Sequence, residues 1–398
     1  MGDMCMTPDM IAERMDGRLR RREDGQETIL PAPTIQNHAA FLSLLPDGAT
    51  VCAWFGGSLE GKSDISIHAA LLPEGADAWS ETRRLTDNPD RSEQNPVIFV
   101  DAENDVWLFN TAQPAGNQDE SRVFQRPLRR DGDGLAAGQA RETDLPAGTF
   151  IRGPARLRDD GAWMLPLFLC NPRAGQRWTG AHDTAAMGVS YDRGRSWEVA
   201  EVPGSLGSVH MTPVPLGGDR MAAFYRRRQA DAVHRSESGD GGRTWTAPAA
   251  TDVPNNNSSI MVAALSDGRI AMVCNPVSAA MSPDRRASLY DELGEGDDRP
   301  DAGGGCQPVW GVPRAPLALC LSSDGGRTFP VRHVIEDGPG TCLSNDSLDG
   351  RNRELSYPAL LVRDDGGLDI AYTLHRRAIR HVRLRPDLLA TLIQEGAR

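Results

Sequence analysis

Apolar segments recur along the chain in pairs, and a short polar turn rich in Asp, Asn and Gly separates the two members of each pair. Asp-Gly between apolar runs is typical of a β-hairpin, because these residues tolerate the backbone angles of a tight turn. The first five turns follow one another at intervals of about 50 to 58 residues, roughly the length of a four-stranded blade. The pattern predicts six hairpins, with turns at Asp47-Gly48, Asn104, Asp160-Gly161, Gly218, Asp267-Gly268 and Asp365-Gly366.

A second motif, Ser-x-Asp-x-Gly-x-(Ser/Thr)-(Trp/Phe), follows three of these hairpins, at residues 190–197, 238–245 and 322–329. This motif is called an Asp-box. Its Asp can accept hydrogen bonds from the backbone of its own turn, its Gly can adopt a positive φ, and its aromatic ring can pack under the next strand. A turn repeated in this way indicates a modular all-β protein.

We therefore predict an all-β fold, a six-bladed β-propeller with Asp-box hairpins, over residues 26–390. Residues 1–25 are expected to form an N-terminal extension and residues 391–398 a C-terminal tail. The last blade is short of one strand, which residues 28–30 are expected to supply, closing the ring. An insertion at about 279–313, rich in Asp, Gly, Pro and Arg, fits a loop over the central channel and a partly disordered excursion equally well.

Composition narrows the classes of partner. The formal net charge of −12 argues against nucleic acid or an anionic membrane surface. No apolar run approaches the roughly 18 residues of a membrane span, and the N-terminus lacks the apolar run of a signal peptide, so a cytoplasmic location is expected. The seven cysteines are scattered without a CxxC pair, so we expect reduced thiols and neither metal nor cofactor. The sequence leaves open whether the chain forms a homo-oligomer.

The Asp-boxes and their spacing make the chain resemble the sialidase (neuraminidase) superfamily of β-propellers. The segments His38-Ala, Trp-Phe-Gly-Gly at 54–57, Asn-Pro-Val at 95–97 and Asn-x-Asn-Ser at 255–258 are similar to a divergent branch, the bacterial and plant "predicted neuraminidase" group. The resemblance covers about residues 36–384. It implies an exo-acting glycoside hydrolase whose substrate is a small terminal acidic sugar, of the sialic or uronic acid type, on a glycan or oligosaccharide.

The same resemblance implies catalytic roles for Asp64 and Tyr357. Asp64 lies in a loop of the first blade, where sialidases place an acid/base Asp, and Tyr357 begins the last hairpin, as their Tyr nucleophile does. A phenol suits this chemistry because it avoids the charge repulsion that a carboxylate nucleophile would meet at an anionic anomeric centre. The alternative for Tyr357 is a core aromatic with a hydrated hydroxyl, and for Asp64 a solvated turn.

Candidate substrate-binding residues come from strand ends in several blades, whose loops surround the axial opening of a propeller. Four arginines could bind a carboxylate through the planar guanidinium: Arg152, Arg226, Arg228 and Arg376. Five further residues are expected to shape the site: Trp54, Glu60, Asn95, His210 and Asn256.

The chain departs from the sialidase pattern at three places. Asn37-His38 stands where sialidases have an Arg, residues 254–260 where they carry the Glu that assists the Tyr, and Asn275-Pro276 where another Arg would follow. His38 could act as a general acid/base, since its pKa is naturally near neutral, or be a buried core histidine. A uronate lyase is therefore an alternative, with His38 or Tyr357 removing a proton beside an Arg-neutralised carboxylate. A non-catalytic sugar-binding propeller is a third reading.

Overall fold

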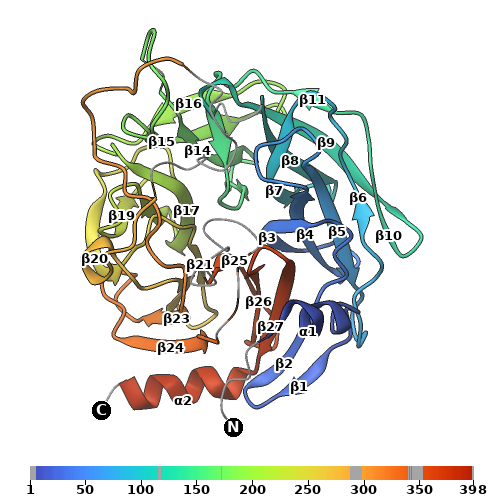
Figure 1. Cartoon of the computed structure of the whole chain (residues 1–398). Helices are drawn as coiled ribbons and strands as arrows, with labels where there is room; N and C mark the ends of the chain where they lie inside the picture. Colours follow the sequence, from blue (N-terminus) through green and yellow to red (C-terminus); the bar gives the residue numbers. More distant parts are fainter. Residues whose placement is uncertain are drawn as a thin grey trace.

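The computed structural model describes residues 6–114, 118–171, 173–286, 298–338, 340, 342 and 353–396. Six antiparallel sheets surround a central axis in these residues, which makes the protein a six-bladed β-propeller (Figure 1). The predicted all-β propeller is therefore confirmed. Among the described residues, no helix has the length and apolar character needed to cross a membrane.

Each of the first three blades runs from the axis outwards in chain order. Blade 1 consists of β3 (Gln36–Leu44), β4 (Thr50–Gly57), β5 (Ser66–Leu72) and β6 (Arg83–Arg84). Blade 2 consists of β7 (Ser92–Val100), β8 (Val106–Gln113), β9 (Arg122–Asp131), β10 (Gly134–Ala137) and β11 (Arg141–Glu142). Blade 3 consists of β12 (Thr149–Ile151), β13 (Arg156–Leu157), β14 (Trp163–Leu169), β15 (Thr184–Ser190) and β16 (Glu198–Glu201).

The fourth and fifth blades repeat this order, and two short 3-10 helices lie between strands. Blade 4 consists of β17 (Ser208–Gly217), β18 (Arg220–Arg227), β19 (Ala232–Ser238) and β20 (Ala249–Pro254). Blade 5 consists of β21 (Met261–Ala264), β22 (Ile270–Cys274), β23 (Leu317–Ser322) and β24 (Val331–Glu336). The 3-10 helices are η1 (Gln118–Glu120) and η2 (Ala279–Met281).

Blade 6 joins the two ends of the chain. Its three inner strands are β25 (Leu355–Val362), β26 (Leu368–Leu374) and β27 (Ala378–Leu384), and its outer strands are β2 (Gly25–Ile29) and β1 (Arg20–Arg22). Thr28 pairs with His381, and Leu30 N–H donates to Ile379 O, so the predicted closure by residues 28–30 is confirmed. Helix α1 (Pro8–Glu13) lies beside this blade, and helix α2 (Pro386–Gly396) follows β27 and runs along β24 of blade 5 (Figure 1).

The sheets are buried on both faces because each blade packs against its neighbours. Every residue of β4, β5 and β26 is buried. This explains why the sequence shows near-continuous apolar runs rather than strict alternation. The packing fixes the innermost strands around the axis, where the candidate site lies.

The Asp-boxes form the predicted turns. In the first, Ser190 Oγ accepts from Gly194 N–H at 2.7 Å, and Asp192 accepts from Ser196 N–H at 2.9 Å. Gly194 has φ of 76°, the left-handed conformation that favours glycine. These hydrogen bonds lower the pKa of Asp192 to about 2, and the bond from the Ser196 hydroxyl has the largest effect. The other two boxes repeat these bonds at Asp240 and at residues 322–328.

The described part of the insertion is a loop packed on blades 3 and 4. Ala279 N–H donates to Ala230 O at 2.8 Å, and Val309 N–H donates to Arg228 O at 2.7 Å. Arg177 N–H likewise donates to Pro300 O. The insertion therefore covers the strand ends that carry Arg228.

Candidate functional site

The innermost strands share a backbone feature at one end of the axis. Five non-glycine residues in or just before the innermost strands of blades 1, 2, 4, 5 and 6 have positive φ: Ala39 (61°), Asn95 (50°), His210 (53°), Asn257 (55°) and Tyr357 (51°). A register shift marks a β-bulge at four of them, in β3, β7, β17 and β25. A left-handed backbone costs about 1–3 kcal/mol at such residues, and bulges re-aim side chains, so this ring of bulges is typical of a functional site.

A small cavity lies at this end of the axis. Its volume is about 20 Å³, enough for about one water molecule. Six of its lining residues are candidates from the sequence: Glu60, Asn95, His210, Arg226, Arg228 and Tyr357. The remaining lining residues are Gln94, Gln118, Phe150 and Phe168.

An arginine holds the Tyr357 hydroxyl. Arg226 Nη1 donates to Tyr357 Oη at 2.7 Å, and Arg226 Nε donates to Asn257 Oδ1 at 2.8 Å. Arg226 Nη2 is buried and has no hydrogen-bond partner among the described residues. Burial lowers the pKa of Arg226 to about 10, so the guanidinium is still charged at neutral pH. The cavity therefore contains a buried cation with unused donors.

Three guanidinium groups surround the Tyr357 ring. Arg152, Arg226 and Arg314 lie 5.4, 5.8 and 5.5 Å from the ring centroid. Such distances allow cation–π attraction and place strong positive charge around the phenol. Negative charge that develops on the phenolic oxygen would be stabilised there.

Two histidines flank the same ring. The His38 ring centroid lies 4.3 Å from that of Tyr357, and the His210 centroid lies at 5.7 Å. Burial, and then the positive charge of Arg376, holds the pKa of His38 well below its ordinary value. Burial, and then the positive charge of Arg226, lowers the pKa of His210 in the same way. The near-neutral pKa that motivates an acid/base role for His38 therefore does not hold in the folded protein. Both imidazoles are neutral at neutral pH.

A buried ion network beside Tyr357 contains two residues that the sequence did not single out, Glu354 and Arg314. The Glu354 carboxylate accepts from Arg314 Nη1 at 2.6 Å, from Arg376 Nε at 3.0 Å and from Ser356 Oγ at 2.7 Å. Burial acts to raise the pKa of Glu354, but Arg314 and Arg376 hold it well below its ordinary value. The network also contains Glu60, which pairs with Arg376.

Glu354 lies three residues before Tyr357 in the sequence. This short spacing is the sequence feature from which the network could have been predicted. Arg314, at the end of the insertion, carries no distinguishing sequence feature. Arg314 pairs with Glu354 because the fold places their two chain segments side by side in a parallel bridge.

Arg228 lines the cavity but already has a counter-ion. Its Nε and Nη2 donate to Asp183 Oδ2 at 2.9 and 2.6 Å, and both residues are buried. The guanidinium also packs over the rings of Phe168, Trp178 and Trp310, at 5.2–5.6 Å from their centroids. Trp310 belongs to the insertion, so the insertion helps to fix Arg228.

Two other sequence candidates, Asp64 and Trp54, do not line the cavity. Asp64 is exposed, and its carboxylate accepts from Ser58 N–H at 2.9 Å and Ser58 Oγ at 3.0 Å. No contact among the described residues joins Asp64 to Tyr357. Trp54 is fully buried in the core, where its Nε1 donates to Asn37 Oδ1 at 2.9 Å. The structure therefore gives Trp54 a packing role.

Asn256 and Arg152 are close to the site but are engaged elsewhere. Asn256 Nδ2 donates to Pro313 O at 2.8 Å and thereby holds the insertion. Arg152 donates to Ser259 Oγ and to four backbone carbonyls at 2.9–3.2 Å, those of residues 39, 40, 357 and 358. Arg152 therefore fixes the bulges of β3 and β25, and each of its three side-chain nitrogens already donates a hydrogen bond to the protein. Within the described residues, no group of three or more His, Cys, Asp or Glu could hold a metal ion.

Residues 48–370 match a family model described as a BNR repeat-like domain, over more than half of the chain. The chain belongs to the BNR repeat-like family. The predicted membership of the sialidase and BNR-repeat superfamily is thereby confirmed. A search of curated protein sequences finds no match.

Solved structures share the fold of this BNR repeat-like propeller. The Hadza microbial sialidase Hz136 is 12% identical, with a TM-score of 0.66 over 89% of this chain and 66% of that chain. A mutant Trypanosoma rangeli sialidase displaying trans-sialidase activity is 14% identical, with a TM-score of 0.61 over 96% of this chain and 59% of that chain. A protein of unknown function from Dyadobacter fermentans is 13% identical, with a TM-score of 0.60 over 93% and 98%. At these identities the similarity shows the fold, and the chain spans slightly less than two thirds of the first of these proteins.

Proposed function

We propose that the protein is a sialidase-like, exo-acting glycoside hydrolase that cleaves a terminal acidic sugar. The observation that carries this proposal is the state of Arg226. It is buried and charged, one of its donors is bound to Tyr357 Oη, and its Nη2 has no partner among the described residues at the cavity. A substrate carboxylate would supply the missing acceptor.

The charge balance around the site supports an anionic substrate. Five arginines lie in or beside the site: Arg152, Arg226, Arg228, Arg314 and Arg376. Three carboxylates pair with members of this set: Glu60, Asp183 and Glu354. The positive excess favours an acid over a neutral sugar.

The cavity is too small for a sugar ring, so the ring would lie at its mouth with the carboxylate directed to Arg226. Tyr357 Oη would then form a bond to the anomeric carbon as the bond to the leaving-group oxygen breaks. The phenol proton would pass to a water molecule in the cavity, and the Arg226 guanidinium would stabilise the negative charge on the phenolic oxygen. Asp64, on its exposed loop, would protonate the leaving group and later activate water.

Turnover of a panel of 4-methylumbelliferyl glycosides tests this proposal. We expect release of 4-methylumbelliferone from a sialoside or a uronide and none from the matched neutral glucoside or galactoside. Tyr357→Phe should lower kcat at least about 1,000-fold, since it removes the nucleophile. Trp107→Phe, far from the cavity, is the matched aromatic control. Absence of turnover with every acidic substrate would contradict the proposal.

A uronate lyase is a second candidate, favoured by one observation. Tyr357 Oη is bonded to the cation Arg226, and two neutral histidines flank its ring. In a lyase, an arginine neutralises the uronate carboxylate while Tyr or His removes the adjacent proton and the 4-linked oxygen leaves. The unsaturated product absorbs ultraviolet light, so rising absorbance with a uronate oligosaccharide identifies this reaction. Binding without any product would instead indicate a non-catalytic sugar-binding propeller.

A further inference from the structure

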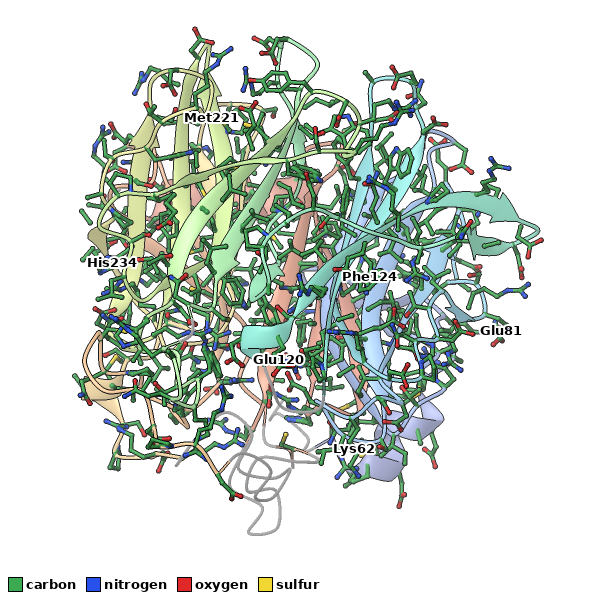
Figure 2. The ribbon with its side chains drawn as sticks, turned by 90° about the horizontal axis from the view of Figure 1, so that it is seen from above. Lys62, Glu81, Glu120, Phe124, Met221 and His234 are labelled. Atoms are coloured by element: carbon green, nitrogen blue, oxygen red, sulfur yellow. The ribbon has the colours of Figure 1, made fainter. Side chains whose placement is uncertain are left out.

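A second and larger cavity lies at the opposite end of the propeller axis. Figure 2 places Met221, which lines it, at the end of the molecule away from Lys62, which belongs to the Asp64 loop. The cavity has a volume of about 730 Å³, within the range of about 300–1,000 Å³ that is typical of small-molecule sites. The innermost strands of all six blades contribute to it, including β3, β7, β13, β17, β21 and β25. We call it the axial pocket.

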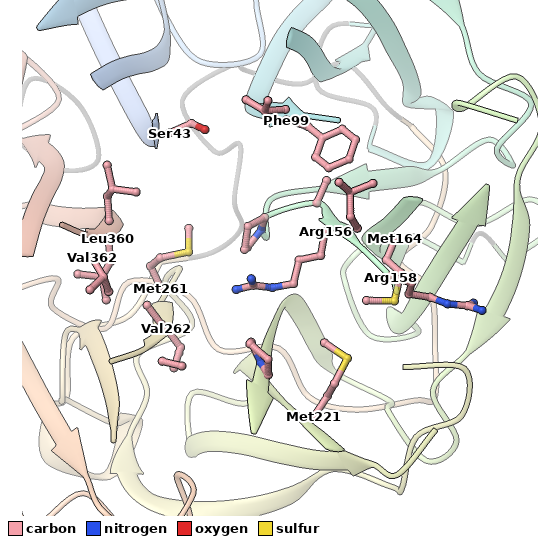
Figure 3. A pocket seen from close by; sticks show the side chains of 18 of the residues that line it. Ser43, Phe99, Arg156, Arg158, Met164, Met221, Met261, Val262, Leu360 and Val362 are labelled. Atoms are coloured by element: carbon pink, nitrogen blue, oxygen red, sulfur yellow. The ribbon is translucent and has the colours of Figure 1, made fainter. Parts of the chain in front are cut away.

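Apolar side chains from several strands form about half of the wall of the axial pocket. Figure 3 shows side chains of several strands around the space, among them Phe99, Met164, Met221, Met261, Val262 and Leu360. Methionine side chains are flexible and polarisable, so they adapt to ligands of irregular shape. A concave site lined by apolar side chains together with a few polar groups is typical of small-molecule binding.

One positive charge reaches into this apolar space. Arg156 extends from β13 into the axial pocket (Figure 3). Its Nε donates to Pro213 O at 2.7 Å, and within the described residues Nη1 and Nη2 have no hydrogen-bond partner and no carboxylate pairs with the side chain. Burial lowers the pKa of Arg156 to about 10, so the group is still charged at neutral pH. Arg156 is only partly buried, so water reaches its guanidinium, and an anionic ligand would replace that water with charge-assisted hydrogen bonds.

Charges at the rim of the pocket select against multiply charged ligands. Arg158 and Arg243 both pair with Asp160. Asp159 and Asp219 are exposed, and neither forms an ion pair in the part of the chain that the structure describes. These two carboxylates would repel a dianion or a polyanion more strongly than a ligand with one negative charge. Arg156 can neutralise that one charge.

From these contacts we infer that the axial pocket binds a monocarboxylate with an apolar body. The carboxylate would accept hydrogen bonds from Arg156 Nη1 and Nη2, and the hydrocarbon would pack against Met164, Met221 and Met261. This site is separate from the Tyr357 cavity and does not depend on the activity proposed for it.

Calorimetric titration of the full chain with decanoate tests this inference. We expect one decanoate per chain and at least tenfold weaker binding of decanol, which has the same length and no charge. Arg156→Gln should weaken decanoate binding at least tenfold and leave decanol binding unchanged. Arg243→Gln is the matched control, because this rim arginine already pairs with Asp160, and it should change the affinity less than twofold.

A second variant keeps the inference testable if Arg156→Gln does not fold. Met261→Trp fills the pocket while retaining Arg156, so it should abolish decanoate binding without changing the far-ultraviolet circular dichroism. The inference is overturned if decanoate does not bind, or if decanol binds equally well. It is also overturned if folded Arg156→Gln or Met261→Trp protein binds decanoate as the unchanged chain does.

Discussion

Arg152 and Arg226 show how partners decide the role of a buried arginine. Both are almost completely buried and both lie within 6 Å of the Tyr357 ring centroid. Arg152 donates to Ser259 and to backbone carbonyls, whereas Arg226 keeps an unpartnered Nη2. A carboxylate binds through free N–H groups, so the two side chains differ in what they can do despite their similar environment.

We expect Arg226→Gln to weaken binding of an acidic substrate. Loss of a charge-assisted hydrogen bond costs about 1.5–3 kcal/mol, so KM for the acidic glycoside should rise about 10- to 100-fold. Steady-state kinetics measures this change. Arg83→Gln should leave KM unchanged, because this exposed arginine forms its ion pair within the described residues with Asp133. Equal KM values for the Arg226→Gln variant and the unchanged chain would show that this arginine does not bind the carboxylate.

Glu354→Gln should destabilise the fold. The substitution removes the negative charge that Arg314 and Arg376 share in the buried network. Breaking a buried ion pair on one side costs about 3–5 kcal/mol, because the remaining charge stays buried without its partner. Urea unfolding followed by tryptophan fluorescence measures the loss. Glu198→Gln, an exposed residue of β16, serves as control, and an unchanged unfolding midpoint for Glu354→Gln would refute a structural role of the network.

At the scale of single elements, the hairpins and Asp-boxes could be predicted from the sequence because their signals are local. A Gly with positive φ and an Asp two residues before it determine an Asp-box turn within eight residues. The contact between Arg314 and Glu354 depends on which blades are neighbours, and the commitment of Arg152 to backbone carbonyls depends on two bulges. No local pattern encodes such contacts, so the ion network and the structural role of Arg152 could not be predicted.

An Asp-box contributes to stability through the hydrogen bonds of its carboxylate. Asp240 accepts from Thr244 N–H at 2.9 Å, from Thr244 Oγ1 and from Arg243 N–H at 3.0 Å. At about 0.5–1.5 kcal/mol for each of these three net bonds, Asp240→Ala should lower the free energy of unfolding by about 1.5–4.5 kcal/mol. Chemical denaturation gives the value. Asp219→Ala, an exposed aspartate, should have almost no effect, and equal losses in the two variants would assign no special role to the box.

At the scale of the whole molecule, several buried histidines make stability depend on pH. Burial lowers the pKa of His68 and of His375 to about 4, and the pKa values of His38 and His210 lie well below the ordinary value. In the unfolded chain these groups take up protons near pH 6.5. Stability should therefore be full above about pH 6.5 and fall as the pH is lowered towards 4, since the unfolded state then binds more protons.

Urea midpoints measured at pH 7.5 and pH 5.0 check this dependence. We expect a clearly lower midpoint at pH 5.0. His68→Asn, which removes one depressed pKa away from the Tyr357 cavity, should reduce the difference between the two pH values. Identical midpoints at both pH values would contradict the view that these imidazoles are buried in the neutral form.

Closure of the ring links the N-terminus to the candidate site. Strand β2 supplies a strand of the blade whose innermost strand carries Tyr357, and Ile29 and Leu30 are almost completely buried there. Burial of two such side chains stabilises the fold by about 3–6 kcal/mol. Removing residues 1–30 should therefore lower the thermal midpoint and abolish turnover, because an open blade 6 would not hold the bulge at Tyr357. The control is a chain that lacks only residues 1–7 and keeps β1 and β2. If the chain lacking residues 1–30 unfolds at the same temperature as the full chain, the ring does not need this strand.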